Sequence, residues 1–141
     1  RPIIHPGTED RADGALELAY VGIAGSLHKR LLSHHLGSST GSSTLRRALG
    51  AWLGGDQGWI TEWRSSRVQH DAMSENALTR WMEQNLYVTW VKHESPDDVE
   101  AEVIALLGPP LNHRHNQGHP NWPALDSARR AWRNGGTPDV K

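Results

Sequence analysis

The stretch that decides the fold is Ser95–Asn112, SPDDVEAEVIALLGPPLN. Its start is typical of a helix, with Ser as N-cap, Pro at the first helical position and two Asp in the first turn. Its end is equally well marked, because the Gly-Pro-Pro run at 108–110 cannot continue a helix. The stretch therefore predicts a helix over 96–107, followed by a rigid corner that carries Asn112.

One carboxylate of this predicted helix lies among apolar side chains. At about 100° per residue, one arc of the helix is apolar: Val99, Val103, Ile104, Leu106 and Leu107. Glu100 falls inside this arc, whereas Glu102 points away from it. A carboxylate on a core-facing stripe costs free energy unless it is paired, hydrogen-bonded or bound to a cation. Glu100 is therefore either a residue at the edge of the stripe that reaches water, or a metal ligand or acid–base group.

Outward from this helix, the pattern predicts further strands and helices. Strands are predicted by β-branched, aromatic or alternating runs at three places: residues 15–22, 58–63 and 86–93. Helices are predicted by apolar periodicity and caps at four more: residues 26–36, 44–53, 74–84 and 123–132. Gly54-Gly55 is expected to end the second of these helices. The fold class that follows is α+β, with a small, mostly antiparallel β-sheet flanked by helices.

Length and composition set the limits for this fold. With 141 residues, 36% of them apolar, the chain suits one domain with a single core. We expect a loop at residues 1–14, the folded domain at 15–134 and a flexible tail at 135–141. The sequence has no Cys, which excludes disulfides and thiolate metal sites. No apolar run is long enough to cross a bilayer and no signal-like start is visible, so we expect a soluble, cytoplasmic protein.

The charge is unevenly distributed along the chain. The formal net charge of −1 argues against a protein that grips nucleic acid by bulk charge alone. From Leu18 through Gly55, however, there is no Asp or Glu. Basic residues do occur in this stretch: Lys29, Arg30, Arg46 and Arg47. The stretch therefore forms either a local anion-binding face or a chance fluctuation in charge.

A second group of polar residues surrounds the start of the predicted helix 26–36. Arg30 and His34 lie one turn apart on one face of that helix. Because Tyr20 lies near the end of the preceding predicted strand, its hydroxyl and the Arg30 guanidinium could meet there and bind an anion. Basic residues at this spacing are also common on solvated helix faces.

These signals together resemble the GIY-YIG nuclease family. Tyr20-Val21-Gly22 is similar to the second half of the motif that names the family. Arg30 follows Tyr20 by ten positions, as in the nuclease domain of the bacterial excision-repair incision protein. The stretch from Glu100 to Asn112 is similar to the closing helix of the family, in which a metal-binding Glu precedes an Asn by twelve positions. The blocks SSTLRRALG and LTRWMEQNLYVTWV resemble those of a bacterial, largely actinobacterial, subgroup, so the resemblance spans roughly Leu18 to Trp132.

The resemblance implies a metal-dependent endonuclease that hydrolyses nucleic-acid phosphodiester bonds, with DNA as the expected substrate and RNA as the alternative. It implies that Glu100 holds Mg²⁺ or Mn²⁺ and that Arg30 neutralises charge on the phosphoryl oxygens. It implies that Tyr20 and His34 act on the attacking water, and that Asn112 holds the geometry of the site. The residues expected to contact phosphate lie around a helix start: Lys29, Ser42, Ser43, Arg46 and Arg47.

One part of the family pattern has no counterpart. The first motif, a GIY-like strand, is absent, and Pro6-Gly7-Thr8-Glu9 puts Glu where its Tyr belongs. We expect that strand upstream of Arg1, so that residues 1–14 are the loop after it. The uncovered edge of the strand with Tyr20 would then be a pairing site for another chain. Two other functions stay open: a catalytically inactive nucleic-acid-binding module, and a metal-binding or interaction domain built on His113, His115 and His119.

Overall fold

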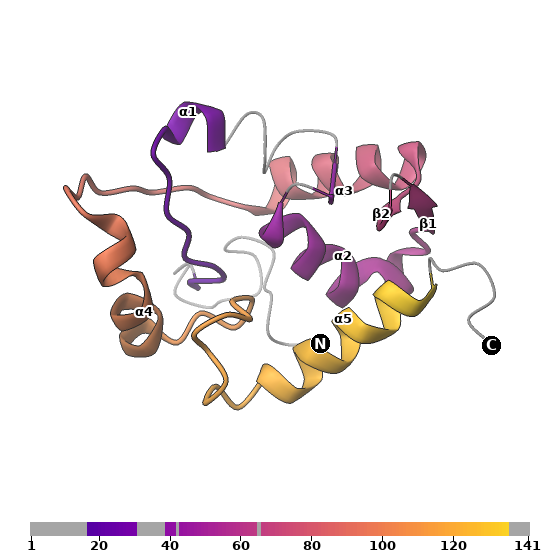
Figure 1. The fold of residues 1–141 in the computed structure, drawn as a ribbon. Helices are drawn as coiled ribbons and strands as arrows, with labels where there is room; N and C mark the ends of the chain where they lie inside the picture. The colour runs from indigo at the N-terminus through magenta and orange to yellow at the C-terminus, as the bar shows by residue number, and fades with distance from the viewer. Residues whose placement is uncertain (1–16, 31–38, 42, 65, 136–141) are drawn as a thin grey trace, which may run out of the picture.

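The computed structural model describes residues 17–30, 39–41, 43–64 and 66–135 (Figure 1). Their elements follow in this order: α1 (Leu27–Lys29), α2 (Thr44–Gln57), β1 (Thr61–Arg64), β2 (Arg67–His70), α3 (Ala72–Asn85), α4 (Pro96–Leu107) and α5 (Trp122–Gly135). The predicted α+β class is confirmed, since helices flank a small antiparallel sheet formed by β1 and β2. None of the described helices is both long and apolar enough to span a membrane.

The helix ends follow from local chemistry. The Ser43 hydroxyl accepts a hydrogen bond from the Arg46 amide at 3.1 Å, which starts α2, and Gly58 ends it in the left-handed conformation with φ 70°. The predicted end at Gly54-Gly55 was therefore wrong, because a helix can pass through glycines when a later residue supplies the cap. Helix α4 has the predicted bounds, and Gly108 ends it with φ 58°.

The sheet differs most from the sequence prediction. The predicted strand at 58–63 corresponds to β1, which pairs with β2 from Thr61↔His70 to Arg64↔Arg67. Strand β2 itself was missed. The other two predicted strands were wrong, because neither residues 17–22 nor residues 86–93 belong to a strand. A strand needs a neighbouring backbone to pair with, and β-propensity alone does not supply one. The segments predicted at 1–14, 31–36 and 136–141 lie outside the described residues.

The core lies where α2, α3 and α5 meet. Its buried apolar side chains come from these three helices and from the corner after α4: Leu45, Ala48, Leu49, Trp52, Leu78, Met82, Leu111 and Leu125. Figure 1 shows α5 running alongside α2, with the hairpin at one end of the molecule and α4 at the other. The hairpin and α4 therefore belong to different regions, joined through the three-helix core.

A buried ion pair runs through this core. The Arg46 Nη2 atom lies 2.7 Å from Glu75 Oε2, and both side chains are almost fully buried. Arg46 also donates to the Thr79 hydroxyl at 2.8 Å, and Glu75 Oε1 accepts from the Thr40 amide and hydroxyl at 2.7 and 2.6 Å. Through these hydrogen bonds the pair ties α2, α3 and the loop at 39–41 together.

Candidate active site

Tyr20 joins the N-terminal segment to the core. Its side chain is half-buried, its ring packs against the core cluster, and its hydroxyl donates to Thr44 Oγ1 at 3.3 Å. Since Thr44 is the first residue of α2, the Tyr20 hydroxyl lies at the start of that helix.

Asn112 binds the residue next to Tyr20. Its Oδ1 accepts from the Val21 amide and its Nδ2 donates to the Val21 carbonyl, both at 2.8 Å. The Leu111 amide donates to the Ala19 carbonyl at 3.0 Å, and Asn112 is buried. The corner after α4 thus pairs with the Tyr20-Val21-Gly22 segment as a short strand would. Two motifs that lie 91 residues apart in sequence are held together by this contact.

The corner itself is fixed by a residue that sequence reasoning missed. The Asn116 Nδ2 atom donates to the Pro109 and Asn112 carbonyls at 2.8 and 2.9 Å, and Asn116 is buried. An Asn in a polar loop carries no sequence signal for this role, because its partners are backbone carbonyls. The contact keeps the Asn112 backbone in place while its side chain holds Val21.

Arg30 lies beside the start of α4. It follows α1, and it lines an open depression of about 650 Å³ together with residues 23–26, Lys29, Pro96 and Asp97. Its side chain is half-buried, and its Nε atom is buried with no hydrogen-bond partner in the described residues. A buried donor without a partner costs free energy, and an anion bound in the depression would satisfy it.

Glu100 lies on the less exposed side of α4, as predicted. That side also carries Pro96, Val99, Val103 and the buried Ile104, whereas Glu102 is exposed. The rest of the predicted apolar arc was wrong: Leu106 and Leu107 are 82% and 54% exposed, because no described element covers the end of α4. Within the described residues no hydrogen bond or ion pair occupies the Glu100 carboxylate. Pro96, one turn earlier, lines the same depression as Arg30.

The predicted phosphate contacts are only partly compatible with the structure. Ser43 and Arg46 are fully buried, the first as the cap of α2 and the second in the ion pair with Glu75, so the structure does not bring these two side chains to the surface. Lys29 is exposed and Arg47 is half-buried at the surface. His34 and Ser42 lie outside the described residues.

Arg47 belongs to a group of arginines that was not predicted. Burial lowers the pKa of Arg47, and the nearby charge of Arg67 lowers it further. Burial also lowers the pKa of Arg129, with smaller contributions from Arg47 and Arg133. The charge of the Tyr20 side chain acts in the opposite direction and raises both pKa values. The spacing of Arg129 and Arg133, one helical turn apart at and just beyond the end of the helix predicted at 123–132, was the signal that could have found them.

The histidine run after α4 has a structural role instead. His113 Nε2 lies 2.8 Å from Asp126 Oδ1, and the His113 ring stacks on Trp122 at 5.0 Å. The hydrogen bond from His113 lowers the pKa of Asp126. Over the described ranges, no three His, Asp or Glu side chains gather as a metal-binding group. His113, His115 and His119 therefore do not come together as a metal site, and the alternative of an interaction domain built on them stays a prediction.

The chemistry of Glu100 fits a hard divalent cation. Mg²⁺ prefers oxygen ligands, and it is commonly bound by one or two carboxylates while water and substrate phosphate fill the other positions. The Glu100 carboxylate is half-buried and has no ion-pair partner among the described residues, so its oxygens could serve as ligands of such an ion.

The model of a protein family described as the GIY-YIG catalytic domain matches residues 8–131 of the chain. No curated protein and no solved structure matches it. The family match includes Tyr20, Arg30, Glu100 and Asn112, the residues that first indicated this resemblance. Because the match covers most of the chain, the protein belongs to the GIY-YIG catalytic domain family.

Proposed function

We propose that this protein is a metal-dependent endonuclease that hydrolyses phosphodiester bonds in DNA. Membership of the family supports nuclease-type activity in general. The observation that carries the proposal for this chain is the double hydrogen bond between Asn112 and the Val21 backbone. It fixes the segment of Tyr20 against the corner that follows the helix of Glu100.

Glu100 would hold Mg²⁺ or Mn²⁺ through its carboxylate oxygens. When bound there, the ion would stabilise negative charge on the phosphoryl and departing oxygens. Glu100 needs no change in its own surroundings for this role, because within the described residues nothing else occupies its carboxylate.

Arg30 would neutralise the phosphoryl group. Its guanidinium carries several donors in a fixed plane, which suits two phosphate oxygens at once. The buried Nε atom without a described partner would gain one when the phosphate is bound. Such a donor contributes most as charge builds up in the transition state.

Tyr20 would orient the attacking water. Its hydroxyl is held by Thr44 and its backbone neighbour Val21 by Asn112, so the ring has little freedom. His34 would assist by hydrogen bond or proton transfer. Asn112 acts as a positioning residue, because its side chain contacts protein backbone.

The test is Mg²⁺-dependent cleavage of supercoiled plasmid and of labelled RNA by the wild type, Glu100→Gln and Glu102→Gln. We expect the wild type to nick DNA, EDTA to stop it, and Glu100→Gln to reduce cleavage to background while binding persists. Glu102→Gln is the matched control, because it removes the same charge from the exposed side of α4. Equal losses in both variants, or faster cleavage of RNA, would contradict the proposal. Binding without cleavage by the wild type would identify an inactive module.

A further inference from the structure

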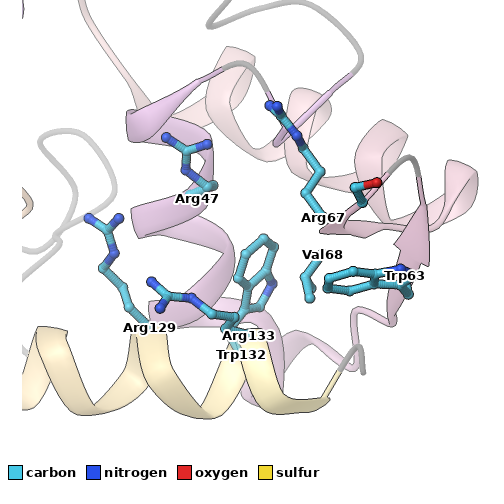
Figure 2. A pocket seen from close by; sticks show the side chains of 8 residues that line it. Arg47, Trp63, Arg67, Val68, Arg129, Trp132 and Arg133 are labelled. Atoms are coloured by element: carbon cyan, nitrogen blue, oxygen red, sulfur yellow. The ribbon is translucent and has the colours of Figure 1, made fainter. Parts of the chain in front are cut away.

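A second concave surface lies away from Glu100. It is a cleft of about 540 Å³ between α2, the β1–β2 hairpin and α5 (Figure 2). Its functional side chains are four arginines and two tryptophans: Arg47, Arg67, Arg129, Arg133, Trp63 and Trp132. Figure 2 shows these side chains arranged around a common opening.

The cleft concentrates positive charge. Its four arginines come from three different elements, and in the described part of the chain none of them forms an ion pair with a carboxylate. The nearest acid on α5 is Asp126, whose oxygens are bonded to His113 and Arg130. Burial and mutual repulsion lower the pKa values of Arg47 and Arg129. Guanidinium groups held close to one another favour a bound anion, because it removes their repulsion.

The donors of the cleft are fixed in place. Arg47 and Arg67 both donate to the Gly41 carbonyl, at 3.1 and 2.7 Å. The Nε atom of Arg47 and the Nε1 atom of Trp132 are buried without a hydrogen-bond partner among the described residues. The Trp132 and His70 rings pack edge to face, with their centroids 5.6 Å apart. The cleft thus offers oriented donors that lack acceptors, which an anionic ligand would supply.

Trp63 adds an apolar surface at the rim. It lies on β1 opposite Val68, and half of its surface is exposed. A duplex phosphate backbone needs no such ring, whereas an unpaired base stacks on an exposed aromatic side chain. Arginines that track phosphates, next to a stacking ring, are the combination found where proteins bind single-stranded nucleic acid.

We propose that this cleft binds the phosphate backbone of an unpaired nucleic-acid strand, with one base stacked on Trp63. The inference deepens the proposed function, on which it rests for the identity of the ligand. Because the Tyr20 hydroxyl is bonded to Thr44, about one turn before Arg47 on α2, a strand in the cleft would lead toward the candidate active site. The substrate would then be a nucleic acid with a single-stranded segment, such as a flap, gap or branch.

The test is binding of a fluorescent single-stranded DNA, alone and annealed as a blunt duplex, measured by anisotropy in EDTA to prevent cleavage. The variants are Arg133→Gln and Trp63→Ala, because neither side chain forms a hydrogen bond with another of the described residues. The matched control is Arg130→Gln, which removes one charge from the same helix at a side chain that is 72% exposed and outside the cleft. Thermal unfolding of each variant shows whether it keeps its fold.

We expect Arg133→Gln to weaken binding of both ligands by about tenfold and to lower the slope of log affinity against log salt by about one. Trp63→Ala should weaken binding of the single strand by about tenfold and of the duplex by less than about twofold. Arg130→Gln should change neither by more than about twofold. The inference is overturned if the wild type does not bind, or if Arg133→Gln matches Arg130→Gln. Equal effects of Trp63→Ala on both ligands would overturn the assignment of an unpaired base.

The binding assay of the cleft variants and the cleavage assay of Glu100→Gln can fail independently of each other. Loss of binding in the cleft variants together with no cleavage by the wild type would support strand binding in the cleft and refute the proposed nuclease activity. Loss of cleavage in Glu100→Gln together with normal binding by the cleft variants would support the proposed nuclease activity and refute strand binding in the cleft.

Discussion

Two regions of this protein differ sharply in how they are held. The core region, α2, α3, α5 and the hairpin, contains nearly all of the buried apolar side chains. The α4 region, residues 17–30 and 86–107, has one buried residue in its long helix, Ile104. Its segment 86–93 exposes four large apolar side chains: Tyr87, Val88, Trp90 and Val91. Stability therefore resides mainly in the core region, and the candidate chemistry lies in a region held by a few directed contacts.

The largest effect on stability is expected from Arg46→Ala in the core region. It leaves the Glu75 carboxylate buried without its partner, so we expect the free energy of unfolding to fall by about 3–5 kcal/mol. The control is Arg64→Ala, which breaks an exposed ion pair with Glu62 and should cost less than about 1 kcal/mol. Urea unfolding measures both. Similar losses in the two variants would remove the special role of the buried pair.

The next effect belongs to the α4 region. Arg30→Lys replaces a planar guanidinium, which can donate to two phosphate oxygens at once, with a single ammonium group. We expect cleavage to slow by about a hundredfold or more. The free energy of unfolding should stay within about 0.5 kcal/mol of the wild type, since Arg30 is only half-buried. Lys29→Arg, at the exposed neighbouring position, is the control and should keep its activity. Near-normal turnover of Arg30→Lys would mean that Arg30 has no part in the chemistry.

The smallest expected effect is a pH dependence of the free energy of unfolding, caused by His70 in the core region. Burial lowers the pKa of His70, which packs so closely on α2 that a Cβ on Gly50 would lie 2.4 Å from its ring. The folded state therefore keeps His70 neutral, while the unfolded state takes up a proton below the ordinary pKa of about 6.5. This contribution to stability is present above that pH and is lost as the pH falls toward the lowered pKa. Urea unfolding between about pH 7.5 and 5 should show stability decreasing, less steeply in His70→Gln. An equal slope in both proteins would exclude His70 as its source.

The same two regions explain which parts of the fold the sequence could predict. Helix α4 was predicted from its own residues, because its Pro start and Gly108 end are local signals. The strands predicted at 17–22 and 86–93 were wrong, because pairing depends on a distant backbone that the local pattern does not reveal. The end of α2 was missed for a related reason, since its cap at Gly58 lies beyond two glycines that usually break a helix.

The candidate site shows the same limit. Arg46 has the sequence appearance of a surface cation, yet its partner Glu75 lies 29 residues away, on a helix whose contact with α2 no spacing predicts. Asn112 was placed correctly on its corner, but its partner Val21 is a backbone group that no side-chain pattern indicates. Arg129 and Arg133 were missed because they join Arg47 in one cleft only through the packing of α5 on α2. Roles set by distant partners require the structure.

The measurement that tests the central claim most directly is the Mg²⁺-dependent rate of DNA cleavage by Glu100→Gln, with its free energy of unfolding measured on the same protein. We expect cleavage to fall to background while the free energy of unfolding stays within about 0.5 kcal/mol of the wild type. Cleavage at the wild-type rate would contradict this, and so would a loss of cleavage that comes with several kcal/mol of lost stability.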